Sequence, residues 1–406
     1  MRILMPCAAF PPFIDGGGPV SSMMLAKMLI GEGHDVRVVH VSDEDRHETY
    51  EGIPVHRIKS LNLYWNYYEP RPTWQKMLWH ALENGNPRAF FAMSREIADF
   101  KPDLVLTVSI ENINVATWAA AKAAGVPVAH TVFSSFMMCW NGVMQKNGED
   151  CQGQCRGCRV TSFGRRQLSR LVDTLIGESH DIIQRHLDEG YFPNAESARI
   201  PAAIEEVCAT EPRPFPKDRP FRIGFLGVHT RFKGLGVLAD AARTLSDDLN
   251  IEFVIGGKGQ GPFAEEVRTR FPQDRTRFLG WTTPKDFFPQ IDSLVYPTLG
   301  REAFGRASIE AFSHAVPVIS TDRGGVAENI DNGVNGYHFV SENVAALRER
   351  IEAIASDPRA YVRMSEGALR SAHLYLKPHV GRELSKTLEA TFDRVTATKN
   401  ATDSVK

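Results

Sequence analysis

The sequence predicts an α/β protein made of two doubly wound, Rossmann-like domains. The chain has 406 residues, which is long for one domain and suits two of roughly 200 residues each. Short apolar runs alternate with helical stretches in both halves, a pattern typical of parallel sheets. A proline-rich, charged segment at residues 211–220 lies between the two patterns and indicates a linker.

The first half opens with a strand–helix–strand unit. Residues 2–5 and 36–41 are predicted strands, and residues 20–31 are the helix between them. A glycine-rich loop with Gly16 and Gly17 follows the first strand. Open α/β sheets bind ligands at the carboxyl ends of their strands. Gly16 and Gly17 are therefore candidate ligand contacts, and a plain turn is the alternative.

The alternation continues to the end of the first half. Helices are expected at 87–100, 115–124, 163–171 and 178–189, and strands at 104–108, 126–130 and 173–176. His130 ends one of these strands, so it is predicted to lie at the ligand-binding edge, although a lone histidine is more often structural. Aromatic residues gather between positions 64 and 79 and suit core or lid packing, or a platform for a sugar.

The pattern restarts after the linker. Strands are expected at 221–226, 252–255, 293–296, 316–320 and 337–340, and helices at 235–244, 342–356, 358–375 and 379–396. The predicted division is a first domain at 1–208, a linker at 209–220, a second domain at 221–380 and a C-terminal helix at 381–406 with a frayed tail.

Composition excludes several classes of protein. The residues are 43% hydrophobic and 24% charged, with a formal net charge of −2, which gives no basic excess for nucleic acid. No run of 18 apolar residues predicts a transmembrane helix. Pro6 follows the first residues too soon for a signal peptide, so a cytoplasmic protein is expected. Peripheral contact with the inner face of a membrane through a local patch stays open.

The segment at residues 298–329 carries the strongest functional signal. Glu302 and Glu310 bracket seven residues, and Phe304-Gly305 opens an amphipathic helix between them. A glycine at a strand-to-helix turn lets backbone amides approach a ligand, and a helix start suits phosphate. Two glutamates at this spacing alone are weak and arise as solvated helix charges.

The whole segment resembles the donor site of retaining GT-B glycosyltransferases of family 4, which use nucleotide sugars. Lys233-Gly234 matches a further family motif, in which arginine and lysine bind the donor diphosphate. Val228 stands where that arginine belongs, and Arg231 is a candidate substitute. The resemblance covers nearly the whole chain, except residues 45–95.

The resemblance implies both a fold and a set of roles. The two domains would face each other across a cleft, the first on the acceptor side, and the last helix would pack back on the first domain. Lys233, Arg231 and the amides around Phe304-Gly305 would neutralise the diphosphate. Glu310 would bind the ribose, Glu302 the sugar hydroxyls, and His130 would orient the sugar.

The resemblance also limits the substrates and cofactors. The donor would be a nucleotide sugar, with UDP- and GDP-sugars expected first, and no catalytic divalent metal would be needed. The acceptor would be a glycan or glycolipid in the synthesis of a surface polysaccharide. Arg301 and Arg306 depart from the family pattern and are candidates to recognise an anionic group. The oligomeric state is left open.

Four cysteines in the first half form a separate candidate site. Cys139, Cys151, Cys155 and Cys158 lie within twenty residues, and glycines between them supply turns. Four thiolates suit a tetrahedral structural zinc site, while an iron–sulfur cluster, disulfides or free thiols are the alternatives. Four protein ligands would leave no open position for catalysis.

Two other functions compete with glycosyl transfer. A sugar-nucleotide epimerase or hydrolase on the same fold would not move the sugar to an acceptor. A non-catalytic scaffold, stabilised by the cysteine site, would bind no nucleotide. The valine at position 228 favours the scaffold, and the two spaced glutamates favour the transferase.

Overall fold

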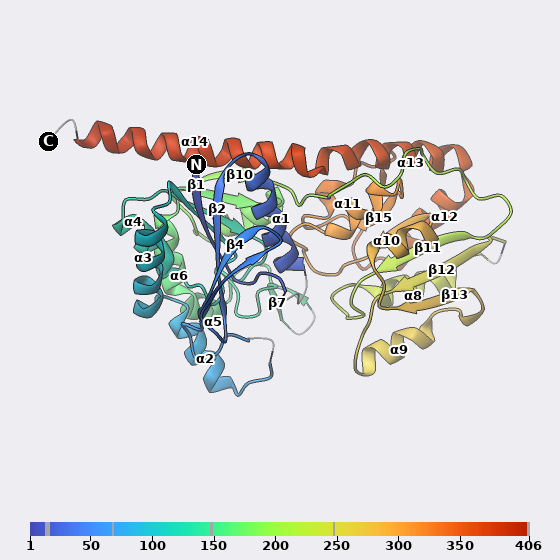
Figure 1. Ribbon diagram of the computed structural model, residues 1–406. Coiled ribbons are helices and arrows are strands. Elements are labelled where there is room, and N and C mark those ends of the chain that lie inside the picture. The colour runs from blue at the N-terminus through green and yellow to red at the C-terminus, as the bar shows by residue number, and fades with distance from the viewer. Residues whose placement is uncertain (13–16, 67–68, 147–148, 247, 404–406) are drawn as a thin grey trace. The chain divides into compact units, whose positions relative to one another are not determined.

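The computed structural model describes residues 1–12, 17–66, 69–146, 149–246 and 248–403. The chain divides into two compact units (Figure 1). Unit 1 contains residues 1–145, 151–203 and 377–406, and unit 2 contains residues 146–150 and 204–376. Apart from the short segment at 146–150, the chain passes from unit 1 to unit 2 after Ala203, a few residues before the expected linker. Each unit is an α/β layer structure around its own sheet.

Unit 1 is organised around an eight-stranded sheet with the order β10-β9-β6-β5-β1-β2-β4-β3. All its neighbouring strands are parallel except β3, which pairs antiparallel with β4. Its strands are β1 (Arg2–Cys7), β2 (Asp35–Ser42), β3 (Arg46–Tyr50), β4 (Ile53–Lys59), β5 (Leu104–Val108), β6 (Val128–Val132), β9 (Thr174–Gly177) and β10 (Glu196–Arg199). The short strands β7 (Gln145–Lys146) and β8 (Glu149–Asp150) pair separately.

The helices of unit 1 come mostly from the expected segments. They are α1 (Gly17–Gly31), α2 (Thr73–Leu82), α3 (Pro87–Phe100), α4 (Ala116–Ala123), α5 (Arg156–Thr161), α6 (Phe163–Leu168), α7 (His180–Asp188) and α14 (Lys377–Asp403). Hydrogen bonds from capping side chains explain where several of these helices begin. Asn86 caps α3 by accepting a hydrogen bond from the amide of Arg88, and Pro87 occupies the first turn. Ser179 caps α7 in the same way.

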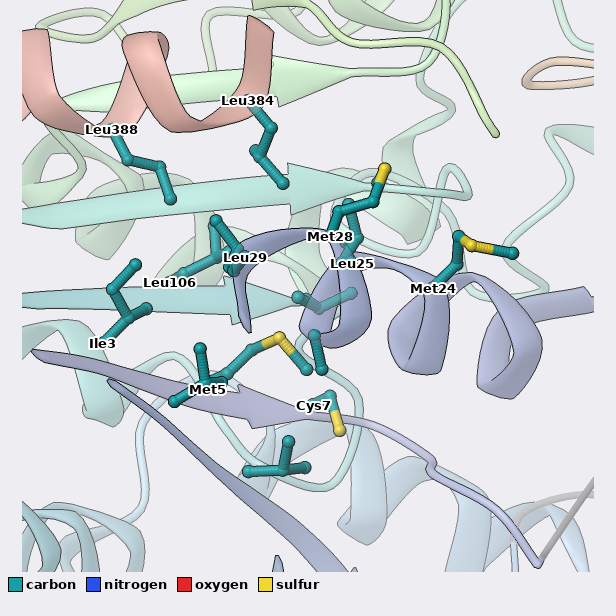
Figure 2. Packing of buried hydrophobic residues seen from close by; sticks show 14 of the residues in the cluster. Ile3, Met5, Cys7, Met24, Leu25, Met28, Leu29, Leu106, Leu384 and Leu388 are labelled. Atoms are coloured by element: carbon teal, nitrogen blue, oxygen red, sulfur yellow. The ribbon is translucent and has the colours of Figure 1, made fainter. Parts of the chain in front are cut away.

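Helix α14 is an integral part of unit 1. Val380, Leu384 and Leu388 are buried in one hydrophobic cluster with residues of β1, β5 and α1. Figure 2 shows Leu384 and Leu388 pointing from α14 toward Leu106 and Leu29. The helix begins at Lys377 rather than at the expected residue 379 and runs for 27 residues. The first unit is therefore completed by residues from the far end of the chain.

Unit 2 has a six-stranded parallel sheet with the order β13-β12-β11-β14-β15-β16. Its strands are β11 (Phe221–Leu226), β12 (Ile251–Gly256), β13 (Thr276–Gly280), β14 (Ser293–Tyr296), β15 (Val318–Thr321) and β16 (Gly336–Phe339). Its helices are α8 (Leu235–Thr244), α9 (Pro262–Arg270), α10 (Pro284–Phe287), α11 (Arg306–Ser313), α12 (Val344–Ser356) and α13 (Pro358–Ala372). This strand order is that of a dinucleotide-binding sheet, with its reversal between β11 and β14.

Candidate functional site

The candidate site in unit 2 lies where the order of the sheet reverses. Strands β11 and β14 are neighbours and run parallel, with Ile223 opposite Ser293. The chain leaves their carboxyl ends through the loops at residues 227–234 and 297–305. Ligands of open α/β sheets bind in the crevice that such diverging connections leave. Residues on these two loops are therefore the first candidates for ligand contact.

Lys233 and Glu302, one from each loop, meet in an ion pair. Lys233 Nζ lies 2.5 Å from Glu302 Oε1. The hydroxyl of Thr298 lies 3.4 Å from the same carboxylate oxygen. Lys233 Nζ also lies 5.8 Å from the centre of the Tyr296 ring, at the end of β14. The structure thus brings together two residues that the sequence predicted for one site.

The surroundings keep Lys233 charged. Burial alone would lower the pKa of the Lys233 ammonium, but Tyr296 and Glu302 favour the charged form and the net effect raises its pKa. Burial raises the pKa of the Tyr296 hydroxyl, with the charge of Glu302 adding to the effect. At neutral pH the site therefore holds a half-buried cation beside a carboxylate and a neutral phenol.

Close packing of the two loops fixes this geometry. The amide of Leu299 and the hydroxyl of Thr298 donate hydrogen bonds to the carbonyl of Phe232, over 2.9 and 3.1 Å. Gly234 has a φ of +69°, and a Cβ at this position would lie 1.8 Å from the carbonyl oxygen of Pro297. Only glycine allows this approach. The loop that carries Lys233 is therefore pressed against the loop that carries Glu302.

Helix α11 begins at Arg306, four residues after Glu302. Gly305 is its N-cap and has a φ of +85°. The Phe304 side chain is buried, and Asn329 Nδ2 donates a 3.0 Å hydrogen bond to the Phe304 carbonyl. Phe304 and Gly305 thus position the start of α11, where partial positive charge from backbone amides favours an anion.

Glu310 is paired within α11 itself. Arg306 Nε lies 3.0 Å from Glu310 Oε1, one helical turn away. Burial raises the pKa of Glu310, against the lowering effect of Arg306. Arg306 Nη1 is buried and has no hydrogen-bond partner among the residues that the structure describes. Arg306 thus faces Glu310, and the expected role of Glu310 on a ribose stays a prediction.

Arg231, the expected substitute for the missing arginine at Val228, points to a different helix. Its guanidinium lies 5.1 Å from the centre of the Phe263 ring and 4.0 Å from Glu266 Oε2, both on α9. The side chain is 73% exposed. Lys233 therefore pairs with Glu302, whereas Arg231 contacts Phe263 and Glu266 of α9. The expected contact of Arg231 with the donor diphosphate stays a prediction.

Comparison with known families identifies the class of protein. The model for "Glycosyl transferases group 1" matches residues 210–370, and the model for "Glycosyl transferase 4-like domain" matches residues 16–203. The chain is similar in structure to sucrose-phosphate synthase from Thermosynechococcus elongatus, with a TM-score of 0.72 and 17% identity over 97% of this chain and 100% of that one. It is also similar to Anabaena HepE in complex with UDP, with a TM-score of 0.71 and 15% identity over 96% and 100%.

The chain is a GT-B glycosyltransferase of the GT4 type. Two sequence relatives of this glycosyltransferase span most of its length. A Klebsiella pneumoniae protein described as an uncharacterized 42.6 kDa protein in the cps region is 26% identical over 331 residues, covering 81% of this chain and 87% of the relative. An uncharacterized glycosyltransferase from Methanocaldococcus jannaschii is 21% identical over 378 residues, covering 88% and 90%.

A shorter match concerns polysaccharide synthesis. A capsular polysaccharide biosynthesis glycosyltransferase from Staphylococcus aureus is 27% identical over 150 residues, covering 34% of this chain and 37% of the relative.

None of the helices within the described ranges is long and apolar enough to cross a membrane.

His130 of the glycosyltransferase lies in the core of unit 1. It is the third residue of β6, which begins and ends two residues later than the predicted strand at 126–130. The prediction that His130 ends the strand was therefore wrong. The side chain is 1% exposed, and Nδ1 lies 2.8 Å from Thr107 Oγ1. Burial lowers its pKa to about 3, so the ring is neutral. A contact between His130 and the donor sugar stays a prediction.

The two glycines of the first loop are placed unequally. Gly16 lies outside the described residues. Gly17 is the first residue of α1, and a Cβ there would meet no atom within 4 Å. Packing therefore does not require glycine at position 17, and its ligand contact stays a prediction.

None of the four cysteines is in a disulfide bond, so that alternative is not seen. The Trp140 amide lies 3.4 Å from Cys158 Sγ, and burial, with Cys139 and Cys155 nearby, raises the Cys158 pKa to about 12. Within the part of the chain that the structure describes, no three His, Cys, Asp or Glu side chains are arranged to hold a metal. The expected zinc site is thus not shown, and zinc binding stays a prediction.

Tyr296 and Thr298 were missed as site residues. Tyr296 lies beside Lys233, and Thr298 contacts both Glu302 and the neighbouring loop. The signal was present, because Tyr296 ends a predicted strand at the edge where the other site residues lie.

Proposed function

We propose that this enzyme transfers a sugar from a nucleotide-sugar donor to a hydroxyl group of a glycan or glycolipid, with retention of anomeric configuration. The observation that carries the proposal is the Lys233–Glu302 pair at the reversal point of the sheet. In this pair Lys233 supplies a positioned cation for the diphosphate, and Glu302 supplies a carboxylate for the sugar hydroxyls. The UDP and UDP-glucose complexes of HepE support a uridine donor as the first candidate.

Lys233 would exchange partners when the donor binds. Without the donor its charge is matched by Glu302, at 2.5 Å. A diphosphate would take that cation and also face the start of α11. Glu302 would then be free to accept hydrogen bonds from sugar hydroxyls. Preorganised positive charge of this kind stabilises the negative charge that develops on the leaving diphosphate, commonly the largest catalytic effect.

The proposed transfer step conserves every atom and charge. The acceptor oxygen forms a bond to the anomeric carbon as the bond from that carbon to the diphosphate oxygen breaks. The acceptor proton passes to the leaving phosphate on the same face, which retains the configuration.

Glu310 would hold the ribose, and this requires Arg306 to share or release the Glu310 carboxylate.

Synthesis of a surface polysaccharide is the proposed setting. The relative from the Klebsiella cps region and the Staphylococcus capsular polysaccharide glycosyltransferase support it. The acceptor would then be a growing glycan or its lipid-linked precursor, which suits contact with a membrane surface.

Product analysis tests the proposed function. UDP-, GDP- and ADP-sugars are incubated with a panel of sugar and glycolipid acceptors, and new glycosides are sought by mass spectrometry. Proton NMR coupling at the new anomeric carbon then gives its configuration. A glycoside of inverted configuration would contradict retention. Release of free sugar with no glycoside for any acceptor would favour a hydrolase instead.

A further inference from the structure

Helix α2 of unit 1 exposes a stripe of apolar side chains. Trp74, Met77 and Leu78 are 64%, 59% and 45% exposed, and Ala81 is exposed as well. These residues stand at positions i, i+3, i+4 and i+7, so they share one face of the helix, while Trp79 on the other face is buried. Helices of globular proteins normally turn such a stripe toward the core. An exposed stripe is instead typical of a surface that binds a partner.

Two further large apolar side chains are exposed on the helices α5 and α6. Val160 of α5 is 77% exposed and Phe163 of α6 is 64% exposed. Helices α2 and α5 lie side by side (Figure 1). Asn84, just beyond α2, donates a 2.7 Å hydrogen bond to the Thr161 carbonyl and accepts one of 3.1 Å from the Arg165 amide. These bonds hold the junction of α5 and α6 against the end of α2, so the exposed residues of the three helices belong to one rigid surface.

Basic side chains border these apolar residues. Residues 70–82 contain one lysine and one arginine, residues 152–172 contain five arginines, and neither segment contains an aspartate or a glutamate. Four of the arginines are exposed and recur every three or four residues on either side of Phe163: Arg156, Arg159, Arg166 and Arg170. We call the exposed apolar residues of α2, α5 and α6 and these four arginines the α2–α6 surface.

Acidic side chains offset part of this positive charge. Glu189 lies 3.8 Å from Arg159, and Glu69 pairs with the arginine of the first segment. Arg165 is buried in unit 1, where two buried glutamates act on its charge, so it adds nothing to the surface. Lys76 of α2 is partly exposed and adds to the charge of the other arginines. The α2–α6 surface is therefore both apolar and positively charged.

This combination of side chains matches an anionic membrane. Aromatic and aliphatic side chains enter the boundary between lipid headgroups and acyl chains, and arginines are attracted to anionic lipids and bind their phosphates. The aliphatic residues distinguish a bilayer from a nucleic acid, whose binding relies on phosphate contacts and stacked aromatic rings. A second copy of the chain fits less well, because a two-fold contact would place the same arginines opposite one another.

We propose that the α2–α6 surface docks the enzyme on an anionic phospholipid membrane, with Trp74, Met77 and Phe163 entering the interface and Arg166 and Arg170 contacting lipid phosphates. The contact is peripheral, because side chains of surface helices reach only the boundary between headgroups and acyl chains. That the docked enzyme meets a lipid-linked acceptor there rests on the proposed function.

Sedimentation with lipid vesicles tests the proposal. The full chain, without nucleotide, is mixed with vesicles of phosphatidylcholine alone and with vesicles that also contain about 30% phosphatidylglycerol. We expect about tenfold tighter binding to the anionic vesicles, because the arginines gain a counter-charge there. Raising the salt from about 0.1 M to about 0.5 M should weaken this binding, since salt screens exposed charges.

A matched pair of variants tests the apolar part of the surface. Trp74→Ala should weaken binding to the anionic vesicles about tenfold, because the burial of a large aromatic side chain is lost. Trp281→Ala is the control, since Trp281 is 69% exposed in unit 2. Because both side chains are exposed, the melting temperatures of the two variants should stay close to that of the wild type.

A second pair of variants tests the charges independently. Arg166→Glu combined with Arg170→Glu reverses two charges of the surface and should weaken binding to the anionic vesicles at least tenfold. Arg382→Glu combined with Lys386→Glu is the control, because these residues are also exposed and four positions apart, on α14. The control should bind like the wild type.

The outcomes separate this inference from the proposed function. Equal binding to both kinds of vesicle, or variants that bind like the wild type, would overturn the membrane surface. Absence of vesicle binding, with a dimer in sedimentation velocity that Trp74→Ala abolishes, would assign the surface to a second copy and overturn the proposal as well. Formation of glycosides without vesicle binding would overturn the surface and leave the transferase standing. Vesicle binding by a chain that forms no glycoside would support the surface and contradict the transferase.

Discussion

The Lys233–Glu302 pair of the candidate site depends on how the two loops that carry these residues pack together. Lys233 and Glu302 are 69 positions apart in sequence and meet because β11 and β14 are neighbours whose loops leave the same edge. The sequence predicted both residues for one site. It did not predict that, without a ligand, each neutralises the other. That pairing depends on the close packing of Gly234 against the Pro297 carbonyl. A local sequence pattern cannot predict such a contact between distant residues.

His130→Ala tests whether the histidine is structural. The ring packs against Trp118 and Phe192 and is almost wholly buried. Its removal leaves a cavity and takes one of three hydrogen-bond partners from the Thr107 hydroxyl, which keeps the Ala129 carbonyl and Trp118 Nε1. We expect the free energy of unfolding to fall by about 3 kcal/mol, measured by urea denaturation. A large loss of turnover in a variant with unchanged stability would instead establish direct contact with the donor.

At the scale of elements, sequence patterns located most of the strands. Buried strands such as β1 and β5 consist of apolar runs, and their positions were predicted to within two residues. The hairpin β3–β4 was missed because β3 is an edge strand with exposed, charged residues. Its turn, Glu51-Gly52, has positive φ at both residues, which is typical of a tight hairpin.

The pairing of Arg306 with Glu310 could have been predicted from sequence, since the two residues are four positions apart on one helix. The exposed contacts of Arg231 with α9 could not, because they depend on where α9 packs. A strand boundary predicted two residues too early placed His130 at a sheet edge, whereas the residue lies in the core. Boundary errors therefore matter most for residues at strand ends.

The cysteine segment provides a test at this scale. If Cys139, Cys151, Cys155 and Cys158 bind zinc, purified protein should contain about one zinc ion per chain by plasma mass spectrometry. Cys158→Ser should lower that content and the melting temperature. Cys208→Ser is the matched control, since Cys208 is an exposed thiol of unit 2. Metal-free protein with the melting temperature of metal-treated protein would contradict the zinc site.

Helix α14 provides a second test. Leu384 is fully buried between α14 and the body of unit 1. Leu384→Ala should lower the free energy of unfolding by about 2–4 kcal/mol through lost burial and a residual cavity. Leu78→Ala, at a leucine that is 45% exposed, should change it by less than about 0.5 kcal/mol. Similar effects of the two variants would show that α14 contributes little to the core.

At the scale of the whole molecule, each of the two units has one large sheet and its own hydrophobic core. Length, alternating patterns and the linker were enough to predict two α/β domains. They could not predict that residues from Lys377 onward complete the first unit, because that contact joins distant parts of the chain. The family resemblance supplied that expectation.

The division of labour between the units follows from their contents. Unit 2 carries the Lys233–Glu302 pair and the start of α11, which suit a diphosphate and a sugar. Unit 1 carries a cavity of about 420 Å³ whose wall includes Trp79, Trp140 and the charged residues Lys76 and Glu111.

Thermal unfolding with UDP tests the central claim most directly. A ligand that binds the folded state raises its stability, by about 2.7 kcal/mol at a concentration 100 times Kd. Wild type, Lys233→Ala and the control Lys285→Ala, at an exposed lysine of α10, are each compared with their own ligand-free protein. We predict a rise for wild type and control and an affinity about 10–100-fold weaker for Lys233→Ala. An equal rise in all three proteins would contradict the assignment of Lys233 to the donor diphosphate.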